Sequence, residues 1–295
     1  MELRGIFLGS GGLRSGWRLL IWFAMALGLI FCIQFAVVKL FHPGDHPFLD
    51  PRWLGGGDLL QLIPVMIATL VMAYFEHRPL RHYYIPGRDF FGRHFWAGAG
   101  WGFGAVSLLI GLIAALGGYR IEGLALHGTP LVYWTLMWLL AAVAIGVVEE
   151  IMFRAYLLRT LADGIGFWPA AAVLALLFGA LHYFTKPYER WEDFACTGLL
   201  ALFICMSVRR LGTLAFAMGF HMGFDWGAMF IYSGRNAGEF AVGKLLDTVW
   251  LGPQWLTGGM LGPEASRLVF VVIAALFVLF ALHYPSWRSS RYVPA

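Results

Sequence analysis

The chain has 295 residues, of which 60% are hydrophobic and only 13% are charged, and its formal net charge is +4. Because an ordinary soluble domain carries roughly 25% charged residues, this composition excludes an ordinary soluble globular protein. In so apolar a chain the excess arginine is better explained by membrane orientation than by nucleic-acid binding, and we expect no nucleic-acid partner.

The three cysteines do not indicate a cysteine-based site. Cys32, Cys196 and Cys205 all lie in apolar segments, and the sequence has no C-x-x-C spacing. Neither a disulfide framework nor a thiolate metal site is therefore supported.

Apolar runs recur along the whole chain, each close to the roughly 20 residues that cross a hydrocarbon core. Because the runs are unbroken, they predict helices. We expect an all-α, polytopic transmembrane bundle of about eight spans, which forms one integral membrane domain over residues 1–295. The predicted spans are 18–41, 58–76, 95–117, 130–161, 168–184, 194–209, 212–232 and 267–284. The fourth is too long for one crossing and should tilt or project from the membrane.

Arginines accumulate at alternate ends of these spans. They are Arg4, Arg14, Arg18, Arg78, Arg81, Arg88, Arg93, Arg154, Arg159, Arg209, Arg210, Arg288 and Arg291. In an eight-span layout all of them fall on one side of the membrane. The positive-inside rule therefore predicts that both termini are cytoplasmic.

Six ionisable residues lie well inside the predicted spans, all of them in a core region at 130–232. They are Glu149, Glu150, Arg154, His182, His221 and Asp225. Ionisable side chains inside a membrane are costly and by default indicate a functional site. A purely structural polar network is the alternative, but such networks normally use Ser, Thr and Asn.

Helix geometry predicts which of these groups can meet. A short turn at 163–168 makes spans four and five a hairpin, and at 1.5 Å per residue Glu149 and His182 lie about 24 Å and about 25 Å from its midpoint. By the same rise His221 and Asp225 lie about 16 Å and about 22 Å from the turn at 208–212. Four groups from three helices can therefore share one layer.

Rotation about the helix axis separates the two adjacent glutamates. Glu150 lies four residues before Arg154, so the two share a helix face and are expected to form a charge pair. Glu149 points in another direction and is expected to face His182 across the hairpin. Phe178 precedes His182 by four residues, and its ring can form a wall of the same pocket.

A partly buried glutamate beside two histidines and a second carboxylate is suited to activating water. The reaction that most needs such a base is the hydrolysis of an amide or ester. His221 and Asp225 would then stabilise the oxyanion or hold a metal. The sequence has no HExxH motif, and no Ser or Cys obviously pairs with a histidine, so an acyl-enzyme mechanism is not favoured.

The same residues carry a family resemblance. EEIMFR at 149–154, FGALH at 178–182 and HMGFD at 221–225 resemble the EExxxR, FxxxH and HxxxN/D motifs of an intramembrane protease family called CPBP or Abi. That family includes type II CAAX prenyl endopeptidases and bacterial bacteriocin-processing or immunity proteins. The segment at 252–268 is similar to a C-terminal stretch of many bacterial members.

The resemblance implies a water-filled catalytic cavity within the membrane, in which Glu149 activates water and His182 assists it. It also implies that His221 and residue 225 bind a metal or stabilise the oxyanion. Prenyl endopeptidases of the family typically carry asparagine where this chain has Asp225, and an ionised carboxylate can only accept hydrogen bonds. Asp225 must therefore be protonated, orient His221 or bind a cation. The last option favours zinc, with His182, His221 and Asp225 as ligands.

Three functions follow from this interpretation. The leading one is an intramembrane endopeptidase of the bacterial inner membrane that acts on a membrane-associated or lipidated protein or peptide, among membrane lipids. The second is a catalytically silent immunity or scaffold protein of the same fold. The third is a proton-coupled transporter with an intramembrane Glu/His relay, although repeated, broken half-helices are absent from the sequence pattern.

Overall fold

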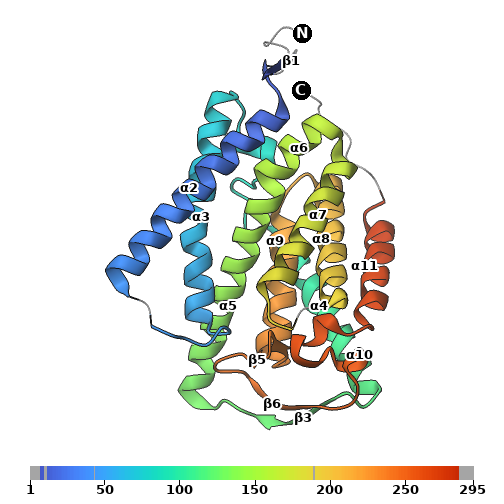
Figure 1. Ribbon diagram of the computed structural model, residues 1–295. Coiled ribbons are helices and arrows are strands. Elements are labelled where there is room, and N and C mark those ends of the chain that lie inside the picture. Colours follow the sequence, from blue (N-terminus) through green and yellow to red (C-terminus); the bar gives the residue numbers. More distant parts are fainter. Residues whose placement is uncertain (1–6, 10–11, 43, 189, 286–295) are drawn as a thin grey trace.

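The protein is a bundle of helices that run up and down alternately (Figure 1), as predicted. The computed structural model describes residues 7–9, 12–42, 44–188 and 190–285, so the predictions for Arg4, Arg288 and Arg291 lie outside the described residues. The main helices are α2 Ser15–Phe41, α3 Pro51–Phe75, α4 Arg93–Ala115, α5 Gly128–Met152, α6 Leu158–Ile165, α7 Phe167–Thr185, α8 Trp191–Leu211, α9 Ala215–Asp225 and α11 Val269–His283.

The short elements lie at the two ends of the bundle. Strand β3, Tyr119–Leu124, pairs antiparallel with β6, Leu246–Trp250, at the end opposite the start of α2 and the end of α11 (Figure 1). We call this the strand end and the opposite one the arginine end. The other short elements are β1 Leu8–Gly9, β2 Gly12–Leu13, η1 Leu80–Tyr83, β4 Arg235–Asn236, β5 Glu239–Phe240, α10 Gln254–Thr257, η4 Gly259–Leu261 and η5 Pro263–Ala265.

In the described part of the chain, six helical stretches are long and apolar enough to cross a membrane, which makes the chain an integral membrane protein. The fourth runs from Gly128 to Ile165 over 38 residues and confirms the overlong span. The seventh predicted span, 212–232, corresponds to α9 and its π-helical continuation η3, which together cover 215–231, whereas α11 covers only 15 residues of the last predicted span. The sequence of α9 is apolar because nearly all of the helix is buried within the bundle.

Helix α3 begins seven residues before the predicted second span. Asp50 caps it by accepting a hydrogen bond from the Arg52 backbone N–H at 2.9 Å, and Pro51 occupies the first helical turn. Both features favour a helix start and outweigh the three glycines at 55–57, which are poor helix formers. Asp58 therefore lies inside the helix instead of at its first residue.

Two segments of π-helix interrupt the helices that carry the predicted site residues. One, η2 at Phe153–Leu157, joins α5 to α6 and contains Arg154; the other, η3 at Trp226–Ile231, directly follows Asp225. Such wide turns are rare and frequently accompany functional sites.

Helices α4 and α9 pack closely because glycines line their contact. A Cβ added to Gly102 would lie 2.0 Å from the Phe220 carbonyl oxygen, and one added to Gly219 would lie 1.9 Å from the Phe95 carbonyl oxygen. Gly98 and Gly223 extend the contact, so both helices carry a small-xxx-small spacing that permits backbone contact. This contact fixes the position of α9, which carries His221 and Asp225.

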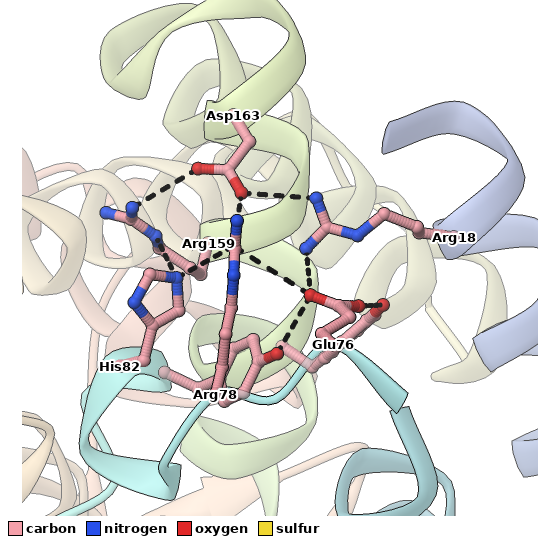
Figure 2. Close-up of polar contacts among 8 residues, drawn as sticks. Arg18, Glu76, Arg78, His82, Arg159 and Asp163 are labelled. Carbon is pink, nitrogen blue, oxygen red and sulfur yellow. Dashed lines mark hydrogen bonds and ion pairs between the residues drawn. The ribbon is translucent and has the colours of Figure 1, made fainter. Parts of the chain in front are cut away.

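At the arginine end, an ionic network joins α2 and α6 to the segment that follows α3 (Figure 2). Glu76 pairs with Arg18 and accepts a hydrogen bond from the Tyr156 hydroxyl at 2.5 Å. Asp163 accepts from Arg18 at 3.2 Å and from Arg78 at 2.8 Å. Buried charges are tolerated when they are paired in this way.

His82 belongs to this network as a neutral ring. Its Nε2 accepts hydrogen bonds from Arg78 Nη1 at 2.9 Å and from Arg159 Nε at 3.0 Å (Figure 2). A ring nitrogen that accepts two guanidinium N–H groups cannot itself carry a proton. Burial, together with Arg159 and Arg78, lowers the pKa of His82 from 6.5 to about 4.

The contact between α4 and α9 gives a direct test. Gly102→Ala should lower the free energy of unfolding by about 1–3 kcal/mol, because the new methyl group forces the two helices apart. Gly104→Ala in the same helix, where an added Cβ meets nothing within 4 Å, should leave stability unchanged or raise it. Unfolding of the purified variants in detergent measures the difference, and equal stabilities would contradict the packing argument.

Candidate active site

A cavity of about 200 Å³ lies inside the bundle, closer to the strand end. Residues of α3, α5, α7, α8 and α9 line it, together with parts of the loops at 42–50 and 232–268. Its polar lining consists of Asp58, Glu149, His182, Lys186, Thr197, His221, Asp225, Asn236 and Glu264. All four residues predicted to be catalytic, and Phe178 as the predicted wall, therefore face one cavity, while their roles stay predictions.

His221 lies between carboxylates contributed by two helices. Its Nδ1 is 2.9 Å from Oε1 of Glu150, and its Nε2 is 3.7 Å from Oε2 of Glu149 and 3.5 Å from Oδ2 of Asp225. Because an ionised carboxylate only accepts hydrogen bonds, Nδ1–H donates to Glu150. The ring is thereby held with Nε2 directed at Glu149 and Asp225.

Glu150 and Arg154 form the predicted charge pair. Nη1 of Arg154 donates to Oε1 of Glu150 at 3.2 Å, and the two side chains are 1% and 0% exposed. The guanidinium of Arg154 also lies 4.3 Å from the centre of the Phe178 ring, a cation–π arrangement. The sequence did not predict the second partner of Glu150, His221, which comes from α9.

His182 is fixed by its own helix. Its Nδ1 donates to the carbonyl oxygen of Phe178 at 3.0 Å, because a carbonyl can only accept, and the two ring centres lie 4.5 Å apart. In a neutral ring this hydrogen bond leaves the lone pair on Nε2. The FxxxH spacing therefore sets both the position and the tautomer of His182.

The predicted contact between Glu149 and His182 is not formed. Both side chains line the cavity, but within the described residues no hydrogen bond or ion pair joins them, and the charged partner of Glu149 is His221. The rise per residue placed Glu149 and His182 at the same depth along their helices, but it does not give the distance between the helices. Helix α7 packs on α8 and α6, which leaves the cavity between His182 and Glu149.

Five polar residues of the cavity were missed by the sequence analysis: Asp58, Lys186, Thr197 of α8, Asn236 and Glu264. Asp58 was placed at the end of a span, and reading Asp50 and Pro51 as a helix start would have put it inside. Lys186 follows His182 by four residues, a spacing that could have placed it on the same helix face. Asn236 and Glu264 come from the loop at 232–268, where no local pattern indicates a cavity.

The predicted zinc site with His182, His221 and Asp225 stays a prediction. Among the described residues no group of three or more His, Cys, Asp or Glu side chains is arranged to hold a metal ion. The side chains as placed therefore do not fit a preformed ion site.

Comparison with known proteins identifies one family. Residues 130–227 match the model of the type II CAAX prenyl endopeptidase Rce1-like family, whereas no curated protein gives a significant match to the chain. The matched region begins at the start of α5 and ends in the π-helical turn after α9, so it contains all three motifs. The match supports a protease of the CAAX intramembrane type. The resemblance expected from the motifs is thus confirmed: residues 130–227 match the Rce1-like type II CAAX prenyl endopeptidase family.

Proposed function

We propose that the chain is an intramembrane endopeptidase in which Glu149 activates the water that attacks a peptide carbonyl. One observation carries the assignment: Glu149 lines the cavity while its Oε2 has no hydrogen-bond partner among the described residues. Oε2 of Glu150 also lacks a partner, but Glu150 does not line the cavity. A buried polar atom in a native protein is normally satisfied by protein or by water. A carboxylate that faces a cavity in this way is suited to bind and deprotonate water.

The histidines have separate roles in the proposed reaction. When Glu149 takes a proton from water and the oxygen attacks the carbonyl carbon, negative charge develops on the carbonyl oxygen. Glu150 holds His221 through Nδ1, so an N–H on Nε2 can donate to that oxyanion. His182, whose Nε2 carries the lone pair in the neutral ring, accepts a hydrogen bond from the attacking water and orients it.

Asp225 positions His221 in this scheme. A carboxylate cannot donate a hydrogen bond to the oxyanion as an asparagine can. Its Oδ2 lies 3.5 Å from Nε2 of His221, four residues earlier on the same helix, where it favours the protonated imidazole that the oxyanion needs. Of the roles left open for Asp225, orientation of His221 is the one that this geometry supports.

The substrate we propose is a membrane-associated or lipidated protein or peptide, reached among membrane lipids. The family match is to prenyl endopeptidases, and the cavity adjoins apolar side chains of α8, including Leu200 and Ile204, which can contact a lipidic group. The match is to an endopeptidase, so it gives no support to a catalytically silent scaffold.

We further propose a bacterial inner membrane location with both termini cytoplasmic. The arginines at the start of α2, after α3 and at the end of α8 all lie at the arginine end of the bundle, the end at which α2 starts and α11 ends (Figure 1). The positive-inside rule places that end in the cytoplasm. The cavity then lies nearer the non-cytoplasmic face.

Membrane topology can be measured with cysteine labelling in a Cys32→Ser background, since Cys196 and Cys205 are buried. A membrane-impermeant maleimide should label Glu122→Cys, which is exposed at the strand end, in intact cells. It should label Arg81→Cys, exposed at the arginine end, only after permeabilisation. The reverse pattern would contradict the proposed orientation.

Catalysis by Glu149 is tested with purified protein and a quenched-fluorescence farnesylated peptide, with its unprenylated counterpart alongside. Glu149→Gln should lower kcat by about 10²–10⁴-fold, the usual contribution of a positioned base, with an unchanged unfolding midpoint because Glu149 makes no hydrogen bond that the fold needs. His182→Ala should also reduce turnover. Full activity in both variants would overturn the assignment.

Glu150→Gln should behave differently, because it removes the anion that compensates Arg154. Breaking a buried ion pair from one side typically costs about 3–5 kcal/mol, so this variant should unfold at lower denaturant concentration as well as lose activity. Adding Arg154→Met should recover much of the stability but not the activity. If Glu150→Gln and Glu149→Gln were equally stable, the division of labour between the two glutamates would be wrong.

A further inference from the structure

The proposed function leaves one feature of the sequence without a role, the glycine-rich segment at 252–268. The segment forms α10, η4 and η5 at the strand end of the bundle and leads into α11. Its Glu264 lines the same cavity as Glu149, His182, His221 and Asp225. An acidic side chain from a distant loop thus enters the candidate active site.

Glycine geometry fixes this loop in one shape. Gly258 and Gly262 have φ values of +76° and +92°, which L-residues with a side chain rarely adopt. A Cβ on Gly258 would lie 1.6 Å from the Gly262 carbonyl oxygen, and one on Gly262 would lie 1.8 Å from the Arg235 carbonyl oxygen. The buried Ser266 adds a hydrogen bond to the Leu256 carbonyl at 2.6 Å. Glu264 is therefore held on a defined backbone, as a functional side chain requires.

Charged neighbours surround the Glu264 carboxyl. Its Oε2 lies 3.9 Å from Nζ of Lys186, which donates to Oδ1 of Asp193 at 3.4 Å. The side chains of Lys186 and Glu264 are only 10% and 18% exposed. Asp225 and His221 of α9 are the other charged groups that act on Glu264. The carboxyl therefore faces charged groups of α7, α8 and α9.

These surroundings let Glu264 carry a proton near neutrality. Burial raises the pKa of Glu264 from 4.5 to about 7, with Lys186 opposing the shift and Asp225 and Asp193 adding to it. Burial also disfavours the charged form of Lys186, but Glu264 and Asp193 outweigh it and raise the Lys186 pKa. The lysine therefore stays cationic while its partner exchanges a proton.

Peptide hydrolysis needs two proton transfers. One group accepts a proton from the attacking water, and another gives a proton to the leaving amine. Two carboxyls in unlike surroundings are a recurrent way for a site to hold both functions. Resting on the proposed function, in which Glu149 is the acceptor, we propose that Glu264 is the proton donor to the leaving amine nitrogen.

Collapse of the tetrahedral intermediate transfers a proton from Glu264 to the leaving nitrogen. In the tetrahedral intermediate the carbonyl re-forms, and the C–N bond breaks with its electron pair passing to nitrogen. The O–H bond of Glu264 breaks as an N–H bond forms on that nitrogen, and Lys186 stabilises the carboxylate that remains. The proton that Glu149 took from water then returns through solvent to Glu264, so both carboxyls regain their starting states.

Two substrates with the same farnesylcysteine acyl group test this role, a peptide and a p-nitrophenyl ester. The ester releases a weakly basic phenolate that leaves without a proton, whereas the amine must be protonated. Glu264→Gln should therefore reduce kcat for the peptide on the order of 10²-fold, with KM unchanged, and keep most of the ester rate. Glu149→Gln should lose both rates. The control Asp247→Asn, an acid 57% exposed on β6, should retain both.

The pH profile provides a second readout. The wild-type peptide rate should fall as pH rises through about 7, because Glu264 loses its proton there. This alkaline limb should vanish in Glu264→Gln, and in Lys186→Met it should move to higher pH, because loss of the cation raises the pKa of Glu264. A merely structural role would lower the rate at every pH without moving the limb.

An infrared titration of the protein without substrate checks the carboxyl directly. A carboxyl signal that titrates near pH 7 should be missing in Glu264→Gln and present in Asp247→Asn. If that signal persists in Glu264→Gln, or if the variant loses peptide and ester hydrolysis equally, Glu264 is not the donor. If the wild type cleaves neither substrate while the carboxyl titrates as expected, the proposed function fails instead, and the donor role fails with it.

Discussion

The structure of the site depends on one interaction, the hydrogen bonding of the Glu150 carboxylate. Glu150 is completely buried, and its Oε1 accepts from Arg154 on its own helical stretch and from His221 on α9. An anion without compensation at this depth would cost several kcal/mol. Two cationic or donor groups must therefore stay within contact distance, and this requirement ties α5 to α9 where the candidate chemistry lies.

The glycine contact between α4 and α9 has a complementary effect. Glycines on α9 let its backbone meet α4 on one side, while His221 and Asp225 face the cavity on the other. Because α9 is short and almost wholly buried, neighbouring helices, not lipid, determine its position. Small side chains on one face and ionisable ones on the other thus set the depth and rotation of His221 together.

Much of this arrangement could be predicted from the sequence because it depends on periodicity within one helix. The spacing of four residues correctly paired Glu150 with Arg154 and placed Phe178 beside His182. Lateral distances between helices could not be predicted in this way, so the sequence paired Glu149 with His182 although His221 is its partner. At α3, the helix start formed by Asp50 and Pro51 outweighs the glycines at 55–57, so Asp58 lies inside the helix.

The two adjacent glutamates show how one sequence doublet can serve stability and chemistry separately. Each carboxyl has one oxygen without a hydrogen-bond partner among the described residues, but Glu149 lines the cavity and is 24% exposed, whereas Glu150 has no exposed surface. Because Oε1 of Glu150 accepts from both Arg154 and His221, protonating that carboxylate would weaken both interactions. Its neighbour, turned by 100°, faces the cavity and keeps its lone pairs for water. Glu150 therefore holds Arg154 and His221 in place, and Glu149, which lines the cavity, is free to act as the base.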